Sequence, residues 1–135
     1  MTFALATLPM IGFVGAAVDY SRGNSAKVAM QAAIDATGLM LSKDAQTLTP
    51  EQLSQRANDT FIALFHRPDV TNLVIVPEFT SPTTSSFKLV LTVTGTVPTT
   101  FTKILGQESM DLNVTTEVVW GVKRLELALA LDVTL

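Results

Sequence analysis

The chain has 135 residues, a formal net charge of −3 at pH 7, and a hydrophobic content of 47%. This length suits one small domain, and the acidic balance with scattered basic residues argues against a nucleic-acid interface. Because cysteine is absent, the composition excludes a disulfide framework, a cysteine-based zinc cluster and a thiol nucleophile.

The chain opens on residues 1–18 without a charged side chain, and the first ionisable side chain is Asp19. As a helix rising ~1.5 Å per residue, this segment spans ~27 Å, close to the ~30 Å hydrocarbon thickness of a bilayer. Pro9 is compatible with a membrane helix, which it kinks without ending. The segment predicts a transmembrane anchor. A cleaved signal, a buried core helix and an interfacial helix are the alternatives, although the run has neither a basic leader nor a charged face.

The charges that flank this run bear on its orientation. Arg22 and Lys27 follow the run, whereas only the chain's own amino group precedes it. By the positive-inside rule, this arrangement taken alone favours a cytoplasmic carboxyl end.

Residues 19–43 continue in a helical pattern. No proline lies between Pro9 and Pro50, so the anchor is expected to run on without a break. A stripe of mainly small residues recurs at spacings of three and four: Ala26, Ala29, Met30, Ala33, Ala36 and Met40. Such a stripe permits close packing, either against another subunit or against the sheet of its own domain.

A second helix is predicted from residue 50, since Thr49 is a good N-cap, Pro50 suits the first helical position and Gln52 completes a capping box. Pro68 is expected to end it. Its predicted apolar face consists of Leu53, Ala57, Phe61, Leu64 and Phe65. His66, the single histidine, is expected to interact with the helix dipole and not to act as a base or ligand.

After Pro68 the hydrophobic period changes from that of a helix to that of a strand. The predicted elements are an edge strand at residues 73–79 interrupted by Pro77, a polar turn at 81–86, a clear strand at 87–94, a turn or short helix at 99–105 closed by Gly106, and a strand at 112–122. Polar alternate faces favour an antiparallel sheet covered on one side by helix. The predicted fold class is α+β, with a long N-terminal membrane helix and a second helix packed on a small, mainly antiparallel sheet, as in pilins.

The sequence contains no arrangement of residues that predicts catalysis. A hydrolase needs an oriented base beside a nucleophile, and one histidine without cysteine does not supply that pair. The carboxylates lie on polar faces or in turns, and glycine-rich phosphate-binding motifs are absent. We therefore expect no enzymatic activity, no cofactor and no small-molecule substrate.

The last segment, residues 125–135, alternates leucine or valine with small and acidic residues. This pattern suits a strand buried on both faces, as in a parallel sheet covered by helices. Since almost no chain follows to supply such helices, the segment is interpreted as the first strand of a domain that has been cut off.

The opening resembles the TadE/TadG-like group of Tad (Flp) pilus-assembly proteins. The matching stretch comprises Phe-Ala-Leu-Ala at residues 3–6, Pro9, Ile-Gly at residues 11–12, Gly-Ala-Ala-Val-Asp-Tyr at residues 15–20, and the alanine-rich residues 27–36. In that group a basic stretch precedes the apolar helix. This chain begins inside the motif, so we expect its basic leader to be missing.

The resemblance implies a structural or assembly component of the pilus, anchored in the bacterial inner membrane by a single pass, with its C-terminal domain in the periplasm. The implied partners are membrane lipid and other pilus-assembly subunits, without nucleic acid. The residues expected to matter are Pro9, Gly12 and Gly15 in the membrane helix, Asp19 and Tyr20 at its boundary, and Ala26 and Ala33 in the packing stripe.

The carboxyl end is similar to the first strand of a von Willebrand factor A-type domain, which TadG-like proteins commonly carry. Asp132 and Thr134 would occupy the first two positions of its metal-ion-dependent adhesion motif. A hard divalent cation needs about six oxygen ligands, so no metal is expected to bind this chain. The implied division is residues 1–18 as anchor, 19–124 as a helix-and-sheet domain, and 125–135 as the partial A-type domain. The alternative function is therefore the anchor and stalk of a metal-dependent adhesion protein.

Overall fold

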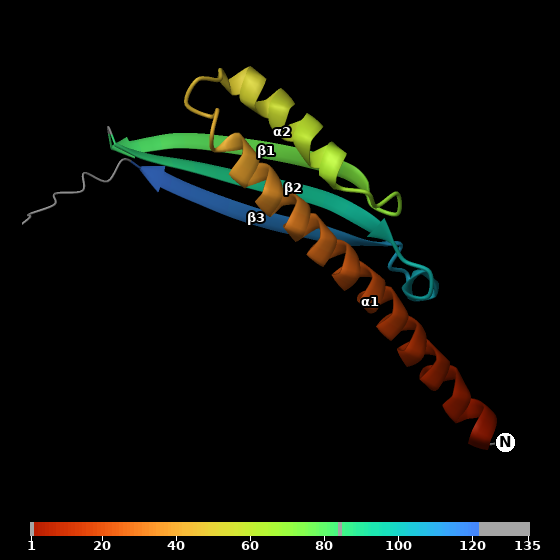
Figure 1. The fold of residues 1–135 in the computed structure, drawn as a ribbon. Coiled ribbons are helices and arrows are strands. Elements are labelled where there is room, and N and C mark those ends of the chain that lie inside the picture. The colour runs from red at the N-terminus through yellow and green to blue at the C-terminus, as the bar shows by residue number, and fades with distance from the viewer. Residues whose placement is uncertain (1, 84, 122–135) are drawn as a thin grey trace, which may run out of the picture.

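The structure is a computed structural model that describes residues 2–83 and 85–121, with the side chains of residues 2–9 and 11 left undescribed. Its elements in chain order are helix α1 (Thr2–Leu41), helix α2 (Pro50–Leu64), strand β1 (Thr71–Thr83), strand β2 (Ser86–Pro98), the 3-10 helix η1 (Thr102–Leu105) and strand β3 (Ser109–Gly121). Two helices lie on one side of a three-stranded sheet (Figure 1). The predicted α+β class and antiparallel sheet are confirmed.

Helix α1 is a single 40-residue helix, roughly 60 Å long. It passes residues 9 and 18 without interruption, as expected from the lack of proline after Pro9. Its C-terminal part lies across the sheet, whereas its N-terminal part extends beyond the edge of the domain (Figure 1).

Helix α2 begins as its sequence predicts. The Thr49 side chain accepts a hydrogen bond from the Gln52 amide, and the Gln52 side chain accepts one from the Thr49 amide, which forms the capping box. The helix ends at Leu64, before the predicted stop at Pro68, because the Phe65 backbone is already extended. The sequence predicts Leu64 on the apolar face, but this residue is 41% exposed.

The sheet has the order β1-β2-β3, and both neighbouring pairs are antiparallel. Strand β1 is an edge strand that contains Pro77, as predicted. The strands are longer than expected: residues 81–83, placed in a turn by the sequence, continue β1 because Thr83 still pairs with Ser86.

The core lies between the helices and the inner face of the sheet. Its buried apolar residues are Ala26, Met30, Ala33, Ile34, Leu41, Ala45, Leu53, Ala57, Phe61, Phe65, Val70, Leu89, Leu91, Val93, Val97, Leu112 and Val114. At the hairpin end, Phe87 stacks with both Phe79 and Trp120, with ring centroids 6.3 Å and 5.9 Å apart. Alternate strand residues face the core, as the period of two predicts.

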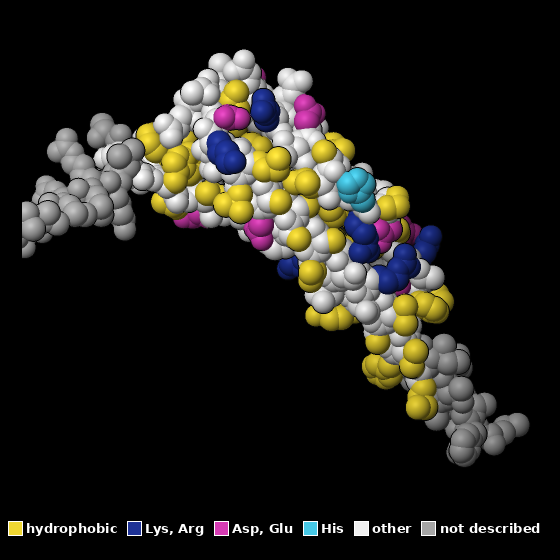
Figure 2. All heavy atoms as spheres, viewed as in Figure 1, with side chains coloured by type: hydrophobic (Ala, Val, Ile, Leu, Met, Phe, Trp, Pro, Cys, Tyr) yellow, Lys and Arg dark blue, Asp and Glu magenta, His cyan; other side chains and the backbone are white. Residues whose placement is uncertain are grey.

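Several large apolar side chains on the N-terminal part of α1 are exposed. Exposed fractions are 68% for Met10, 77% for Phe13, 66% for Val14 and 42% for Val18. Figure 2 shows these apolar side chains along the projecting helix, with charged side chains gathered where it meets the domain. Within the part of the chain that the structure describes, no helix has the length and apolar character needed to cross a membrane. Residues 125–135, the predicted strand of an A-type domain, lie outside the described residues.

Candidate functional site: the contact between helix α1 and the loop at residues 99–106

Asp19 of α1 binds the start of η1. Its Oδ1 accepts a hydrogen bond from the Thr100 amide at 2.9 Å, and its Oδ2 accepts bonds from the Phe101 and Thr102 amides at 2.8 Å each. The Thr102 hydroxyl donates a fourth bond to Oδ2 at 3.0 Å. The first amides of a helix have no partner inside that helix, and η1 has no side-chain cap of its own. Asp19 therefore caps η1 from a different helix.

Asp19 is buried, with the residue only 4% exposed. Its pKa is lowered from 3.8 to about 2, chiefly by the backbone hydrogen bond from Thr102, with further lowering from the Thr100 and Phe101 amides and the Thr102 hydroxyl. Burial acts in the opposite direction but is outweighed. The carboxylate is thus charged at any physiological pH, and charge-assisted bonds to it are the stronger kind.

Other contacts hold the same loop. Arg22 donates from Nη1 to the Thr100 hydroxyl at 2.9 Å. The Thr99 amide donates to the Glu108 carbonyl at 3.0 Å, and the Thr99 hydroxyl donates to the Gln107 carbonyl. Gly106 ends η1 at a φ of 91°, a backbone conformation that favours glycine. The loop therefore has a defined shape as well as a defined position on α1.

Phe101 packs directly on Gly15 of α1. A Cβ built at Gly15 would lie 2.5 Å from the Phe101 Cβ, so only glycine permits this approach. Beside this contact lies an apolar hollow of about 250 Å³, lined by Met10, Val14, Gly15, Val18 and Phe101. The loop and the projecting helix therefore share one apolar surface.

A second charged contact joins α1 to the segment before β1. Arg67 binds Asp69 through Nε to Oδ1 and Nη2 to Oδ2, at 2.8 Å each, and Arg67 Nη1 donates to the Ser25 hydroxyl at 3.1 Å. Both side chains of this ion pair are about one quarter exposed. The hydrogen bond from Arg67 is the main cause that lowers the pKa of Asp69, and the charge of Arg22 adds to it. The sequence did not single out this pair.

The residues that the sequence marks as important have different surroundings in the structure. Gly15 and Asp19 both contact the loop, whereas Tyr20 is 68% exposed and a Cβ at Gly12 would meet nothing within 4 Å. Pro9 lies within α1, and its side chain is among those not described. Ala26 and Ala33 are buried in the core at 0% and 6% exposure. Of the two packing partners left open for the small-residue stripe, these alanines contact their own domain.

Sequence reasoning missed the partners of Asp19. It predicted a turn or short helix at residues 99–105, but Thr100 and Thr102 lie 81 and 83 positions from Asp19 along the chain. No local pattern marks such a distant pair. The available signal was the position of Asp19, the first charged residue after a long uncharged run.

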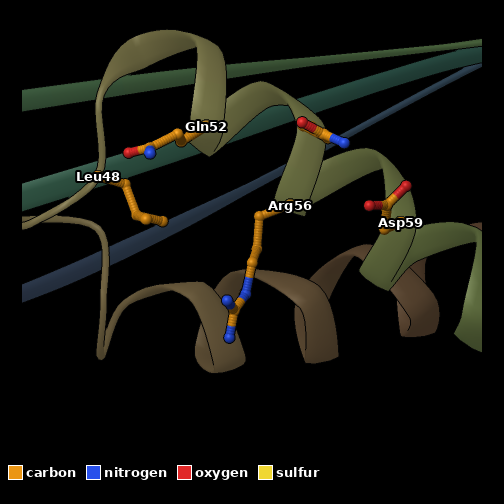
Figure 3. A pocket seen from close by; sticks show the side chains of 5 residues that line it. Leu48, Gln52, Arg56 and Asp59 are labelled. Carbon is orange, nitrogen blue, oxygen red and sulfur yellow. The ribbon is translucent and has the colours of Figure 1, made fainter.

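A second hollow lies on the outer side of α2 and is lined by Leu48, Gln52, Gln55, Arg56 and Asp59 (Figure 3). Arg56 points from α2 toward α1 and forms an exposed ion pair of 3.5 Å with Asp44. Exposed pairs of this kind contribute little to stability. This hollow holds no nucleophile beside a base and shows no arrangement for chemistry.

Among residues 2–83 and 85–121, no group of three or more histidine, cysteine or acidic side chains could hold a metal ion. Asp132 and Thr134, the two positions compared with a metal-dependent adhesion motif, lie outside these described ranges. His66 is exposed, with Nδ1 3.3 Å from the Leu64 carbonyl oxygen.

Comparison with known proteins finds a family match for the first helix. Residues 1–40 match the family described as Flp pilus-assembly TadE/G-like. The matched stretch coincides with α1 and includes Gly15 and Asp19. No curated protein and no solved structure matches the chain. The likeness to a pilin and to a von Willebrand factor A-type domain therefore stays a prediction, whereas the resemblance of the first helix to the TadE/G-like family is confirmed.

Proposed function

We propose that this chain is a membrane-anchored structural or assembly component of a Tad/Flp-type pilus, which acts by membrane tethering and subunit packing. The observation that supports it best is the extent of the family match, because residues 1–40 coincide with α1. This helix joins the uncharged opening of the chain to the folded domain. A component of this kind works mechanically and needs no catalytic site.

Residues 1–18 are proposed to hold the chain in the bilayer, and residues 19–124 to form the domain beside it. The segment has no charged side chain, and its described large apolar residues project from the domain unpacked, at exposures between 42% for Val18 and 77% for Phe13. In water this exposure is unfavourable, whereas in lipid it is favourable. Tethering is therefore inferred from the uncharged sequence together with these exposed apolar side chains.

The domain is proposed to offer packing surfaces to other pilus-assembly subunits. Strand β1 is an edge of the sheet, and its Val74 and Val76 side chains are each 55% exposed on the face turned away from the helices. A free edge can accept a strand from a partner. No nucleic acid, cofactor or small-molecule substrate enters this proposal.

The proposed location is the bacterial inner membrane, crossed once, with the domain in the periplasm. The family resemblance supports this orientation, whereas Arg22 and Lys27 after the uncharged run favour the opposite one.

Tethering is tested with a pair of substitutions on the same helix. Val14→Asp places a charge in the proposed membrane segment at a side chain that is 66% exposed, and Val28→Asp makes the same change at one that is 62% exposed in the domain-packed part. We expect carbonate washing to release Val14→Asp from membranes while the wild-type chain and Val28→Asp stay in the pellet. Release of the wild-type chain itself would refute tethering.

Orientation is tested with the cysteine-free background. Gln46→Cys places a thiol in the exposed connector between α1 and α2. A membrane-impermeant maleimide should label it in intact spheroplasts. Labelling only after lysis would place the domain in the cytoplasm and overturn the proposed location, but not the tether.

The pilus role is tested by complementation. In a strain that lacks the gene, the wild-type chain should restore surface pili, and Val28→Asp should restore them as well. Val14→Asp should fail if tethering is required. Normal piliation in the deletion strain would overturn the proposed role.

A second candidate function rests on residues 125–135 alone. Their alternation, with Asp132 and Thr134 placed as in a metal-ion-dependent adhesion motif, favours the anchor and stalk of a metal-dependent adhesion protein. Sequencing the gene beyond codon 135 tests this directly. A serine two positions after Thr134 and a continuing α/β pattern would support it, and a stop codon would refute it.

A further inference from the structure

The loop at residues 99–106 carries three exposed apolar side chains at its tip. Ile104 is 84% exposed and Leu105 is 75% exposed, while Phe101 is 43% exposed. Ile104 is the most exposed of the large hydrophobic side chains that the structure describes. Three such residues lie within five positions of the chain, and exposed apolar surface of this kind marks a binding site.

The contacts on α1 set the position of this patch. Three backbone amides and one hydroxyl of the loop bind the Asp19 carboxylate, and Phe101 rests on Gly15. Gly15 belongs to the segment proposed to lie in the bilayer. A side chain in contact with residue 15 lies at the same depth as residue 15. If α1 is embedded up to residue 18, the loop must therefore meet the membrane surface.

The polar groups of the loop suit that location. Asp19, one turn beyond Gly15, would be a costly charge at a lipid boundary, but four hydrogen bonds from the loop satisfy it. Lys103 lies between the apolar residues of the tip and has a long side chain that can extend to the headgroup phosphates. Phe101 also lines the hollow that is formed with Met10, Val14 and Val18 of α1.

We propose that the η1 loop is a second membrane contact, in which Phe101, Ile104 and Leu105 enter the interfacial layer of the lipid bilayer beside α1. Asp19 fixes the loop at that depth. The contact rests on the proposed membrane tether and adds a function to the domain: it sets the tilt and rotation of the sheet relative to the membrane. Two attachment points hold a domain in one orientation, whereas a single helix leaves it free to rotate.

The experiment uses the full chain in lipid vesicles, with one cysteine carrying an environment-sensitive fluorophore. Because the wild-type chain has no cysteine, each label reports one site. Ile104→Cys tests the loop, Phe13→Cys tests the tether, and Gln46→Cys in the exposed connector is the water-exposed control. All three positions are solvent-exposed in the domain, so folding should be unaffected. Spin-labelled lipids with the quencher near the headgroup or deep in the acyl chain measure depth.

We expect blue-shifted emission at position 104 and several-fold stronger quenching by the shallow spin label than at position 46. At position 13 the deep spin label should quench more strongly than the shallow one. Protection at position 13 with a water-exposed position 104 would overturn the loop contact and leave the tether standing. Water exposure at both positions would refute the tether itself.

A protein partner at the loop is separated from lipid by dilution. If a second copy of the chain covers the tip, the blue shift at position 104 disappears as the lipid-to-protein ratio rises, and lipid-borne quenchers have no effect. Either observation would overturn the proposal. A blue shift that persists at high dilution and responds to the shallow quencher supports it.

Discussion

The two halves of α1 both carry large apolar side chains but place them in opposite surroundings. In the half that crosses the sheet, Met30, Ile34 and Leu41 are buried in the core. In the half that projects, Phe13 and Val14 are exposed at 77% and 66%. One continuous helix thus supplies the core of a domain with one end and an unpacked apolar surface with the other. An apolar residue favours an environment without water, but its sequence alone does not say whether that environment is the protein core or another apolar surface.

The halves also differ in how they use small residues. In the packed half, Ala26 and Ala33 lie against the domain's own core. In the projecting half, Gly15 admits one aromatic side chain from the loop, while Gly12 faces open space. The small residues named here therefore permit close packing against the core in the packed half of α1, and a single close contact, at Gly15, in the projecting half.

The largest expected effect comes from removing core volume on the packed half. Ile34→Ala should destabilise the domain by about 2–5 kcal/mol, because a fully buried side chain leaves a cavity. Phe13→Ala, on the projecting half, should change the free energy of unfolding of the domain little, since Phe13 has no packing to lose there. Denaturant unfolding of both variants in the same detergent measures the difference. Equal losses would show that the two halves are packed alike.

A second effect comes from adding volume on the packed half. Ala33→Leu should cost about 1–3 kcal/mol, because three extra carbons must enter a filled core beside a residue that is 6% exposed. Ala32→Leu is the matched control, since Ala32 is the exposed neighbour on the same helix. Thermal unfolding compares the two. If Ala33→Leu left stability unchanged but reduced binding to other subunits, the stripe would be an intersubunit surface, the alternative that the sequence left open.

Most of the fold was predictable because its signals are local. The capping box at Thr49, the switch from a period of 3.6 to a period of 2 after Pro68, and Gly106 at the end of η1 each depend on a few neighbouring residues. Boundaries were less accurate, since strand length depends on the partner: β1 continues past residue 79 because β2 supplies pairing up to Thr83. Leu64 was misplaced because the helix ends there and its side chain turns to solvent.

The candidate site was only half predictable. Gly15 and Asp19 stood out beside the uncharged run, but their roles come from residues more than 80 positions away, and no periodic pattern records such a contact. In the sequence, a carboxylate that caps a helix of a distant segment cannot be distinguished from one that is exposed to solvent. The charge at position 19 was evident, and the loop that it holds was not.

The third prediction concerns that loop and is smaller and more local. Asp19→Asn retains the shape of the side chain but turns an amide toward backbone N–H groups, so the amides of Phe101 and Thr102 should exchange with solvent about tenfold faster or more. Asp59→Asn on α2 is the control and should leave these amides unchanged. Unchanged protection in Asp19→Asn would show that the loop holds its shape without the carboxylate.

The pH dependence of the same contact has a definite sign. The pKa of Asp19 is lowered from 3.8 to about 2, so the carboxylate stabilises the folded loop fully above pH 4. This contribution is lost as the pH falls through about 2, where the folded form takes up its proton. Protection of the Phe101 amide, corrected for intrinsic exchange, should fall over that window in the wild-type chain. It should show no comparable fall in Asp19→Asn.

The smallest expected effect compares the two glycines of the projecting half. In a helix interior exposed to water, Gly→Ala stabilises by about 1 kcal/mol. Gly12→Ala should show this gain in detergent-solubilised chain, because nothing lies within 4 Å of the new Cβ. Gly15→Ala should lose most of it, since its Cβ would lie 2.5 Å from the Phe101 Cβ and must displace that ring.

The double variant Gly15→Ala/Phe101→Ala separates the two contributions. An alanine at position 101 still has a Cβ but lacks the ring, so part of the clash is relieved and part of the helix gain should return. The coupling between the two substitutions in thermal unfolding then measures the contact itself. Additive effects would mean that Phe101 does not rest on α1. The loop would then not share the depth of residue 15, and its apolar tip would need another explanation than the membrane.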